Sequence, residues 1–323
     1  MKNWLFENLI CPRDRSSLKR SDGGLVCENG HIYPVISDVP IMLIEEAEST
    51  HDYIKRTFEA VKDNSVLTEA DRSTQNTDAI DPFVQGEIPY TSGILYFSVQ
   101  NRLERYPIPH LRLPEGNGAT LLDIGCNWGR WCVAAGRLGY RPIGIDPSLR
   151  AVLAAKRVCK QLGVEADFVV GDCRFLPFRS DAFDTVFSYG VYQHLSKDNT
   201  KISIEEAARV LKPDGNSLIQ MPNVYGLRQF YNYWRRGFSE GEGFDIRYWK
   251  PSEILSVFER LIGPTKMTAD CYFGLGLQSS DADLFPVHYR FLVRTSEAIR
   301  KVSDRVKPLA RAADSVYLYS TKN

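Results

Sequence analysis

Long hydrophobic runs, an excess of either charge and a secretory leader are all missing from this 323-residue sequence. Without about 18 consecutive apolar residues, no membrane-spanning helix is expected. Forty basic residues balance 40 acidic ones, so the overall charge favours neither nucleic acid nor a membrane surface as a partner. The first residues, "MKNWLFENLICPRD", hold a short apolar patch but lack the layout of a signal peptide.

The cysteine content argues against a further class, the small disulfide-rich proteins. The chain has seven cysteines, an odd number, scattered along its length. This is typical of reduced thiols and predicts a cytoplasmic protein. Internal repeats and low-complexity tracts are also absent, and 43% of the residues are hydrophobic. That content suffices for one large domain and a smaller one.

Two phosphate-binding motifs are missing from the most distinctive stretch, "LLDIGCNWGRW". A dinucleotide site needs Gly-x-Gly-x-x-Gly, because the second glycine admits the pyrophosphate. Here Asn127 stands at that place, between Gly125 and Gly129, and the Gly-Lys-Ser/Thr of a P-loop is absent too. Glycines after a strand let the backbone turn sharply close to a ligand. The stretch therefore predicts a nucleotide-like cofactor without phosphates, or else a tight turn with no ligand.

Apolar strands alternate with helical patterns from residue 119 onward, and a last strand is expected at 315–322. The earlier strands are expected at 119–125, 142–146, 166–172, 182–190 and 216–222, and the helices at 128–138, 148–162 and 201–211. This alternation predicts βαβ units, a parallel sheet and a doubly wound, Rossmann-like α/β fold.

Three regions are expected along the chain. Residues 1–46 have short strand patterns and predict a small β-rich module. Residues 47–112 predict a helix, a mobile connection across "DNSVLTEADRSTQNTDAID" and a second helix in the aromatic stretch "YTSGILYFSVQNRLERYP". Residues 113–323 form the main domain, with helical insertions at about 224–314. These insertions would cover the carboxyl ends of the strands, where open α/β sheets bind ligands.

Acidic residues stand at the ends of three successive strands, at Asp123, Asp146 and Asp172. Asp146 follows Gly125 by 21 residues (146 − 125), the spacing of an acid that accepts from both ribose hydroxyls. S-adenosylmethionine would suit such a site. Asp123 would fix the loop and meet its ammonium group, and Asp172 would accept from its adenine amino group. Each acid alone could equally be a solvated turn residue or a helix cap.

The ordered motifs "LLDIGCNWGRW", "GIDPS", "GDCRFLPF", "FDTVFSYGVYQHLS" and "ARVLKPDGNSLIQMPN" resemble those of class I S-adenosylmethionine-dependent methyltransferases, type 11-like, over about residues 115–225. The resemblance implies a seven-stranded sheet and does not imply an acceptor. One departure is Asn127, at a position that is usually glycine. The resemblance and the reasoning from the strand ends together give these candidate cofactor-binding residues: Asp123, Gly125, Asn127, Gly129, Asp146, Pro147, Asp172, Cys173 and Tyr189.

The segment "LICPRDRSSLKRSDGGLVCENGHIYPVISDVPIMLIEEA" resembles small zinc-ribbon-like proteins that activate tRNA and protein methyltransferases. A zinc ribbon needs Cys-x2-Cys twice. Here Cys11 pairs with Asp14, and Cys27 is followed by Gly30 and His31. Because two of four thiolates are missing, we expect a module without metal. A Cys11/Asp14/Cys27/His31 site is the alternative. The module would dock on the main domain or help to recognise an acceptor.

Methyl transfer from a sulfonium is an in-line displacement that needs a base only when the acceptor must lose a proton. His194, just past the fourth strand, is the candidate base, because histidine titrates near neutral pH; the alternative is a structural histidine. Tyr189 and Tyr192 could orient the acceptor. The segment 224–249 mixes aromatics with arginines. It predicts an amphipathic cap helix with a solvated arginine face, or a surface for an aromatic, glycosylated, anionic or base-containing acceptor.

These observations predict S-adenosylmethionine-dependent methylation of a small molecule or biosynthetic intermediate, with O-methylation first. The alternatives are a tRNA or protein methyltransferase aided by the N-terminal module, and a cofactor-binding subunit without activity of its own. The balanced charge and the absence of an Asn/Asp-Pro-Pro-Tyr/Phe motif after the fourth strand argue against a nucleic-acid acceptor. The acceptor and the oligomeric state stay open.

Overall fold

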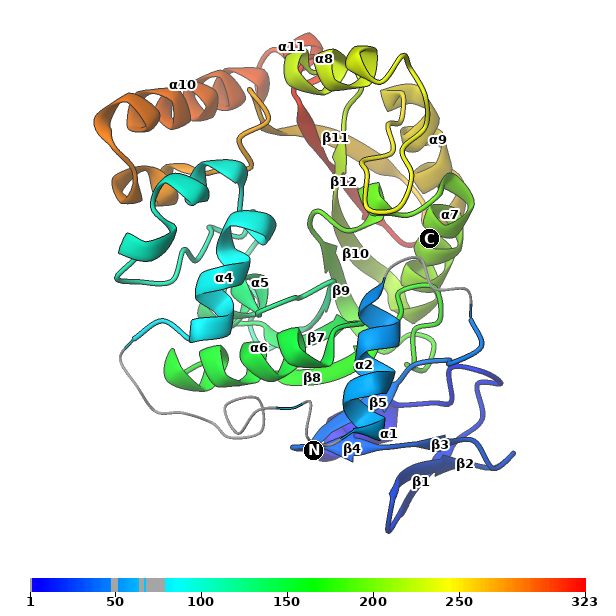
Figure 1. The fold of residues 1–323 in the computed structure, drawn as a ribbon. Helices are drawn as coiled ribbons and strands as arrows, with labels where there is room; N and C mark the ends of the chain where they lie inside the picture. Colours follow the sequence, from blue (N-terminus) through cyan, green and yellow to red (C-terminus); the bar gives the residue numbers. More distant parts are fainter. Residues whose placement is uncertain (1, 48–51, 64–66, 68–78) are drawn as a thin grey trace.

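A large mixed sheet runs through the middle of the computed structural model (Figure 1), which describes residues 2–47, 52–63, 67 and 79–323. Within these residues the sheet has nine strands in the order β11-β12-β10-β9-β6-β7-β8-β5-β4. Their bounds are β4 Val35–Ile36, β5 Val39–Met42, β6 Thr120–Ile124, β7 Arg141–Asp146, β8 Asp167–Gly171, β9 Phe183–Ser188, β10 Leu211–Pro222, β11 Thr265–Cys271 and β12 Ser315–Thr321.

The predicted doubly wound α/β class is confirmed by the pairing of five central strands. β8, β7, β6, β9 and β10 lie side by side and parallel. From β6 the chain passes to β7 and then to β8 on one side, and it then crosses to β9 on the other side of β6. The point between β6 and β9 is therefore a topological switch, where the loops after neighbouring strands diverge and leave room for a ligand.

One strand of the sheet was missed by the sequence interpretation. Residues 224–314 were expected to hold helices, but β11 lies within them and pairs antiparallel with β12 at the edge of the sheet. Only its last three residues are buried. An edge strand of this kind carries polar residues such as Lys266 and lacks the continuous apolar run of a central strand.

The other edge of the sheet is extended by the N-terminal residues. β5 pairs parallel with β8 through Ile41 with Val170 and Met42 with Gly171, and β4 pairs with β5. These two strands explain why the sheet within the described residues exceeds the seven strands expected. All four residues of β5 are buried, as its apolar sequence predicts, but the sequence does not reveal which strand it joins.

Helices pack on both faces of the sheet. They are α1 Asn3–Asn8, α2 Asp52–Lys62, α4 Pro82–Thr91, α5 Arg130–Arg137, α6 Leu149–Gln161, α7 Lys197–Val210, α8 Leu227–Arg235, α9 Pro251–Leu261, α10 Val287–Ser303 and α11 Lys307–Ala310. Alternate residues of a strand point to opposite faces. Accordingly, Val169 joins the core that includes residues of α7 and α9. Phe168 and Val170 join the core that includes residues of α4 and α6.

The N-terminal segment packs directly against the main sheet. Its own small sheet is β1 Leu18–Ser21, β2 Gly24–Cys27 and β3 Ile32–Tyr33, at the end of the molecule opposite α8 and α10 (Figure 1). The Ile10 amide donates to the Pro177 carbonyl at 3.0 Å, and the Arg179 amide donates to the Asn8 carbonyl at 2.9 Å. These hydrogen bonds attach the segment to the loop between β8 and β9.

The second helix of the 47–112 region begins earlier than expected. The sequence interpretation put it in the aromatic stretch from Tyr90, but α4 starts at Pro82 and ends at Thr91. Asp81 caps it, because its carboxylate accepts from the Phe83 and Val84 amides, and proline suits the first helical position. The aromatic residues continue in a 3-10 turn, Ile94–Ser98. Most of the predicted mobile connection lies outside the described residues.

The face that α8 presents to solvent is more apolar than expected, although Arg235 is also exposed there. Its exposed stripe is apolar and consists of Leu227, Phe230, Tyr231 and Trp234. Two arginines point inward instead, because they find backbone acceptors there. Arg228 donates to the Gly274 carbonyl at 3.4 Å and Arg236 to the Ile246 carbonyl at 2.8 Å. In the described part of the chain, none of the helices is long and apolar enough to cross a membrane.

Candidate functional site

A cavity of about 470 Å³ lies at the carboxyl ends of β6 to β9. Its lining includes residues from the loop that follows each of these four strands. Further parts of the wall come from segments distant in sequence, which include Tyr53 and Ile54 of α2, residues 90–94, Phe244, Ile246 and residues 274–276. The volume and the mixture of apolar and polar walls are typical of a small-molecule site.

In the loop after β6, every second residue from 125 to 129 has a positive φ. Gly125, Asn127 and Gly129 have φ of 75°, 42° and 82°. Asparagine tolerates this left-handed region better than most residues. The Asn127 carboxamide also accepts from the Trp128 amide at 2.8 Å. The departure from glycine at position 127 therefore fits the turn without unusual strain.

The two glycines of this loop have different neighbours. Gly125 lines the cavity, and a Cβ there would lie 2.1 Å from Cγ2 of Val191. Gly129 is absent from the lining; a Cβ there would meet Ala155 of α6 at 2.9 Å. Gly125 thus keeps the backbone open beside the cavity, whereas Gly129 permits close packing of α5 on α6.

Asp146 ends β7 and lines the cavity together with Pro147. One carboxylate oxygen accepts from the Asn127 amide at 3.0 Å and the other from the Ser148 amide at 2.9 Å. Burial raises the pKa of Asp146 to about 6. Because each oxygen holds more than one lone pair, the carboxylate keeps acceptor capacity for ligand hydroxyls.

Asp123 lies behind the cavity wall, not in it. Its side chain is fully buried. One oxygen accepts from Sγ of Cys132 at 3.3 Å, and the other has no partner within the described residues. Burial raises the pKa of Asp123 to about 7. The structure thus places Asp123 against Cys132 of α5 and outside the cavity lining, so a direct contact with the cofactor's ammonium group stays a prediction.

Asp172 and Cys173 both line the cavity after β8. The Asp172 carboxylate is held by Arg174, whose Nη2 donates at 2.6 Å and whose backbone amide donates at 2.9 Å. This ion pair is almost fully buried and was not foreseen. It fixes the carboxylate in one orientation and leaves fewer lone pairs for a ligand.

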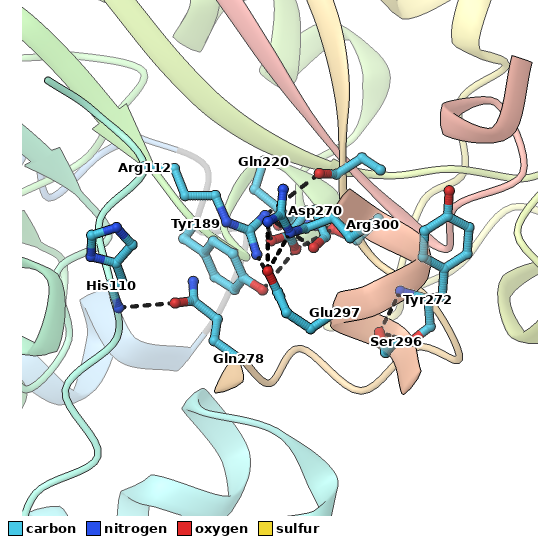
Figure 2. Close-up of polar contacts among 12 residues, drawn as sticks. His110, Arg112, Tyr189, Gln220, Asp270, Tyr272, Gln278, Ser296, Glu297 and Arg300 are labelled. Atoms are coloured by element: carbon cyan, nitrogen blue, oxygen red, sulfur yellow. Dashed lines mark hydrogen bonds and ion pairs between the residues drawn. The ribbon is translucent and has the colours of Figure 1, made fainter. Parts of the chain in front are cut away.

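Tyr189 follows β9 and joins the cavity to a buried polar network (Figure 2). Its hydroxyl donates to Asp270 at 2.9 Å, and Asp270 also faces Arg112 at 3.2 Å. Arg112 in turn lies 3.5 Å from Glu297 of α10. Burial raises the pKa of Tyr189 well above its usual value. The tyrosine therefore stays neutral, with its ring packed 4.9 Å from that of Trp131.

Two further residues named in the sequence analysis lie in different surroundings. His194 lines the cavity, is stacked on Phe244 at 3.9 Å and lies 2.7 Å from the Phe244 carbonyl through Nδ1. Its Nε2 lies 3.1 Å from the side-chain carboxamide nitrogen, Nε2, of Gln193. Tyr192 is fully buried instead, and its hydroxyl donates to the Ser203 carbonyl at 3.3 Å. Tyr192 is therefore not placed to orient an acceptor.

The sequence analysis missed Arg130, the first residue of α5. Arg130 lines the cavity although it is only 4% exposed. Its Nε and Nη1 have no hydrogen-bond partner within the described residues. A buried guanidinium donor without a partner is costly, so these two nitrogens fit an anionic group of a ligand. The signal was a charged residue directly after the glycine loop, which the sequence interpretation did not consider.

The site has the features that S-adenosylmethionine requires. Gly125 opens the backbone beside the cavity, Asp146 offers acceptors for hydroxyls, and Arg130 offers unused donors for a carboxylate. The raised pKa values of Asp123 and Asp146 mean that their negative charges are poorly solvated, and a nearby cation would relieve this. A sulfonium and an ammonium are such cations.

Comparison with known proteins agrees with this geometry. Residues 121–215 match a family described as a methyltransferase domain. A ubiquinone biosynthesis O-methyltransferase of Nitrobacter winogradskyi is 32% identical over 52% of this chain and 66% of its own. An uncharacterized protein of Methanocaldococcus jannaschii, MJ1252, is 30% identical over 35% of this chain and 40% of its own. The chain thus spans less than two thirds of these relatives.

Among solved structures, a S-adenosylmethionine-dependent methyltransferase from Methanosarcina mazei is 18% identical, covers 68% of this chain and 99% of its own, and has a TM-score of 0.46. The segment that matches the methyltransferase family, residues 121–215, runs from β6 into β10. It therefore includes the strands whose ends form the cavity. Residues 121–215 of this chain are therefore similar to a methyltransferase domain.

Proposed function

We propose that the whole chain transfers a methyl group from S-adenosylmethionine to an oxygen atom of a small molecule. The single observation that carries this proposal is the cavity at the ends of β6 to β9. Its wall holds the buried carboxylate of Asp146 and the guanidinium of Arg130, whose Nε and Nη1 have no hydrogen-bond partner among the described residues. Bound there, the cofactor supplies a methyl group on a positively charged sulfur, which leaves as a neutral thioether.

The cofactor would lie across the strand ends, with its amino acid end near β6 and its adenosyl group near β7 and β8. Asp146 would accept from the two ribose hydroxyls, and Pro147 and Cys173 would border the ribose and adenine. The backbone of Gly125 and Asn127 would face the amino acid end. Because the Asp172 carboxylate already accepts from Arg174 at 2.6 Å, its contact with the adenine amino group would use a remaining lone pair.

Arg130 would bind the cofactor's carboxylate. Its Nε and Nη1, which have no hydrogen-bond partner within the described residues, can each donate a charge-assisted hydrogen bond to a carboxylate oxygen. We expect Arg130→Met to weaken binding of S-adenosylhomocysteine by about 10- to 100-fold, the effect of one or two charge-assisted hydrogen bonds. Methylthioadenosine lacks the amino acid end and serves as the matched ligand, because its affinity should not change. An equal loss for both ligands would contradict this role.

The acceptor would enter beside the mostly apolar wall opposite the strand ends. Ile94, Ile246 and Leu275 supply apolar surface there, and Gln193 and His194 supply polar groups. Such a wall suits a compound with an aromatic or other apolar body and one hydroxyl. The relatives named ubiquinone biosynthesis O-methyltransferase, at 26–32% identity over part of this chain, support an oxygen acceptor.

His194 would take the proton of that hydroxyl. Nδ1 lies 2.7 Å from the Phe244 carbonyl, which selects the tautomer with hydrogen on Nδ1 and the lone pair on Nε2. The acceptor's O–H bond would break toward Nε2 after the Gln193 amide rotates away. The oxygen would then form a bond to the methyl carbon as the carbon–sulfur bond breaks, and the electron pair would stay on sulfur.

The experiment is incubation of the purified chain with S-adenosylmethionine labelled in its methyl group and fractionated cell extract. We expect label in the small-molecule fraction, in a form that resists the base treatment that cleaves methyl esters. Label in RNA or protein would contradict the proposed acceptor and would favour the alternative acceptors. Cofactor binding without transfer to any fraction would instead indicate a non-catalytic subunit.

A further inference from the structure

The sequence interpretation expected no metal, but four side chains of the N-terminal segment meet at one point. Cys11, Asp14, Cys27 and His31 each direct one potential ligand atom inward, and these atoms all lie within 4.8 Å of one another. We propose that these four residues bind a structural zinc ion through two thiolates, one carboxylate and one imidazole, at a site that lies apart from the methyl-transfer cavity.

Four of the six distances between the ligand atoms are close to the edges of a tetrahedron around a metal, and all six are within 4.8 Å. Nδ1 of His31 lies 3.5 Å from Sγ of Cys11 and 3.3 Å from Sγ of Cys27. Oδ2 of Asp14 lies 3.1 Å from the same Nδ1 and 3.7 Å from Sγ of Cys27. Zinc bonds of about 2.3 Å to sulfur and about 2.0 Å to nitrogen or oxygen predict tetrahedral edges of about 3.3 Å between nitrogen and oxygen, about 3.5 Å between either of these and sulfur, and about 3.8 Å between two sulfurs. The four distances lie within about 0.2 Å of these values.

Hydrogen bonding alone does not explain this arrangement. A single imidazole nitrogen either donates one hydrogen bond or accepts one, yet Nδ1 of His31 faces two sulfurs and a carboxylate oxygen at once. One ion at the centre would satisfy all four atoms together. Two thiolates, an imidazole and a carboxylate form a ligand set that zinc accepts in closed, four-coordinate sites.

Two tight turns prepare the ligands. In the first turn the Cys11 amide donates to the Ser16 carbonyl at 2.9 Å, which brings Cys11 and Asp14 together. In the second the Gly30 amide donates to the Cys27 carbonyl at 3.0 Å, and Gly30 has a φ of 83°. Each turn therefore supplies one thiol and one other ligand, from spacings of Cys-x2-Asp and Cys-x3-His.

Further hydrogen bonds hold the ligands in place, as is usual around metals. The His31 amide donates to Sγ of Cys27 at 3.3 Å. The Asn29 carboxamide donates to Oδ2 of Asp14 at 2.8 Å, and the Ser16 hydroxyl donates to Oδ1 of Asp14 at 2.6 Å. The side chains of Asp14 and His31 are partly exposed, so an ion can enter from solvent.

The ion would join the turn after α1 to the β2–β3 hairpin. Formation of two zinc–sulfur bonds releases up to two thiol protons, so the affinity should rise with pH. The expected consequence is stability of the N-terminal segment. The methyl transfer itself needs no metal, and the lining of the cavity includes none of the four ligands.

Elemental analysis of the chain purified under reducing conditions tests the proposal. We expect about one zinc per chain, as a closed structural site binds, and a much smaller content in Cys27→Ser and in His31→Ala. Cys159→Ala and His288→Ala are the matched controls, because these residues lie outside the cluster; their zinc content should equal that of the unchanged chain. A reduced, folded chain that holds no zinc after exposure to zinc salts would overturn the proposal, as would equal zinc in all variants.

Cobalt keeps the test decisive if a variant does not fold. The metal-stripped chain should show the visible bands of tetrahedral cobalt and a sulfur-to-cobalt charge-transfer band on addition of Co²⁺. Asp14→Cys keeps four ligands, so it should still bind one ion and strengthen the charge-transfer band. A cobalt spectrum of octahedral type, or a Cys11–Cys27 disulfide in the untreated protein, would contradict the proposal. These readouts are independent of cofactor binding and activity.

Discussion

Replacement of Asp146 by asparagine should separate the binding role of this residue from its effect on stability. Burial raises the pKa of Asp146 from 3.8 to about 6. At about 1.4 kcal/mol per pKa unit, this rise means that the ionised carboxylate costs the folded, cofactor-free chain about 3 kcal/mol. Asparagine removes that cost but cannot accept from both the Asn127 and Ser148 amides as well as the carboxylate does, a loss of about 1–3 kcal/mol.

The two effects nearly cancel at pH 8, so Asp146→Asn should change the free energy of unfolding by no more than about 2 kcal/mol. The pH dependence should change more clearly. Because the folded pKa lies above the unfolded one, the folded chain binds more protons between pH 3.8 and about 6. Its stability therefore falls as pH rises through that window. This fall should be smaller in the variant.

Cofactor binding should respond strongly to the same substitution. Two charge-assisted hydrogen bonds to the ribose are worth about 1.5–3 kcal/mol each, so the dissociation constant of S-adenosylhomocysteine should rise about 100-fold or more. Denaturant unfolding at several pH values measures stability, and calorimetry measures affinity. Asp167→Asn is the matched control, since burial also raises the pKa of Asp167, which lies outside the cavity lining. Unchanged affinity in folded Asp146→Asn would refute the reasoning.

Three further substitutions test other parts of the cavity. Gly125→Ala places a Cβ 2.1 Å from Val191. This clash should shift the loop after β6 and weaken S-adenosylhomocysteine binding at least about tenfold. Wild-type affinity would contradict the role of this loop in cofactor binding. Tyr189→Phe loses the hydroxyl's 2.9 Å bond to Asp270 and should lower the free energy of unfolding by about 1–3 kcal/mol with little change in affinity; a large loss of affinity alone would mean that the hydroxyl binds the cofactor. His194→Asn should lower the turnover rate about 100-fold or more and remove the acid limb of the pH profile, with unchanged cofactor affinity; full activity would leave His194 a structural role.

The sheet and its ligand-binding edge were predictable because their signals are local. The runs that became β6 to β10 alternate with helices at spacings that permit only a few topologies, and the loops after parallel strands must meet at one edge. For this reason Gly125, Asp146 and Cys173 could be placed on one site from spacing alone. Asn127 was recognised from the sequence only as a departure from the usual glycine, and the structure explains it because asparagine tolerates positive φ.

The features that were missed depend on contacts between distant segments. The pairing of β5 with β8 joins residues more than a hundred positions apart. The sequence of neither strand indicates which strand it will pair with. The ion pair between Asp172 and Arg174 competes with a ligand in a way that spacing does not reveal. Arg130 was overlooked, and the Cys11 cluster was disfavoured because two of the four expected thiolates are missing. Among the described residues, Arg130 has donors without partners and the cluster has converging ligand atoms.

The most direct test of the central claim is a calorimetric titration of the purified chain with S-adenosylhomocysteine and, separately, with NADH. We expect one S-adenosylhomocysteine site per chain with a dissociation constant in the micromolar range, about −8 kcal/mol, and no binding of NADH, because Asn127 and the bulk of Trp128 stand where a pyrophosphate would lie. Tight NADH binding without S-adenosylhomocysteine binding would contradict the account.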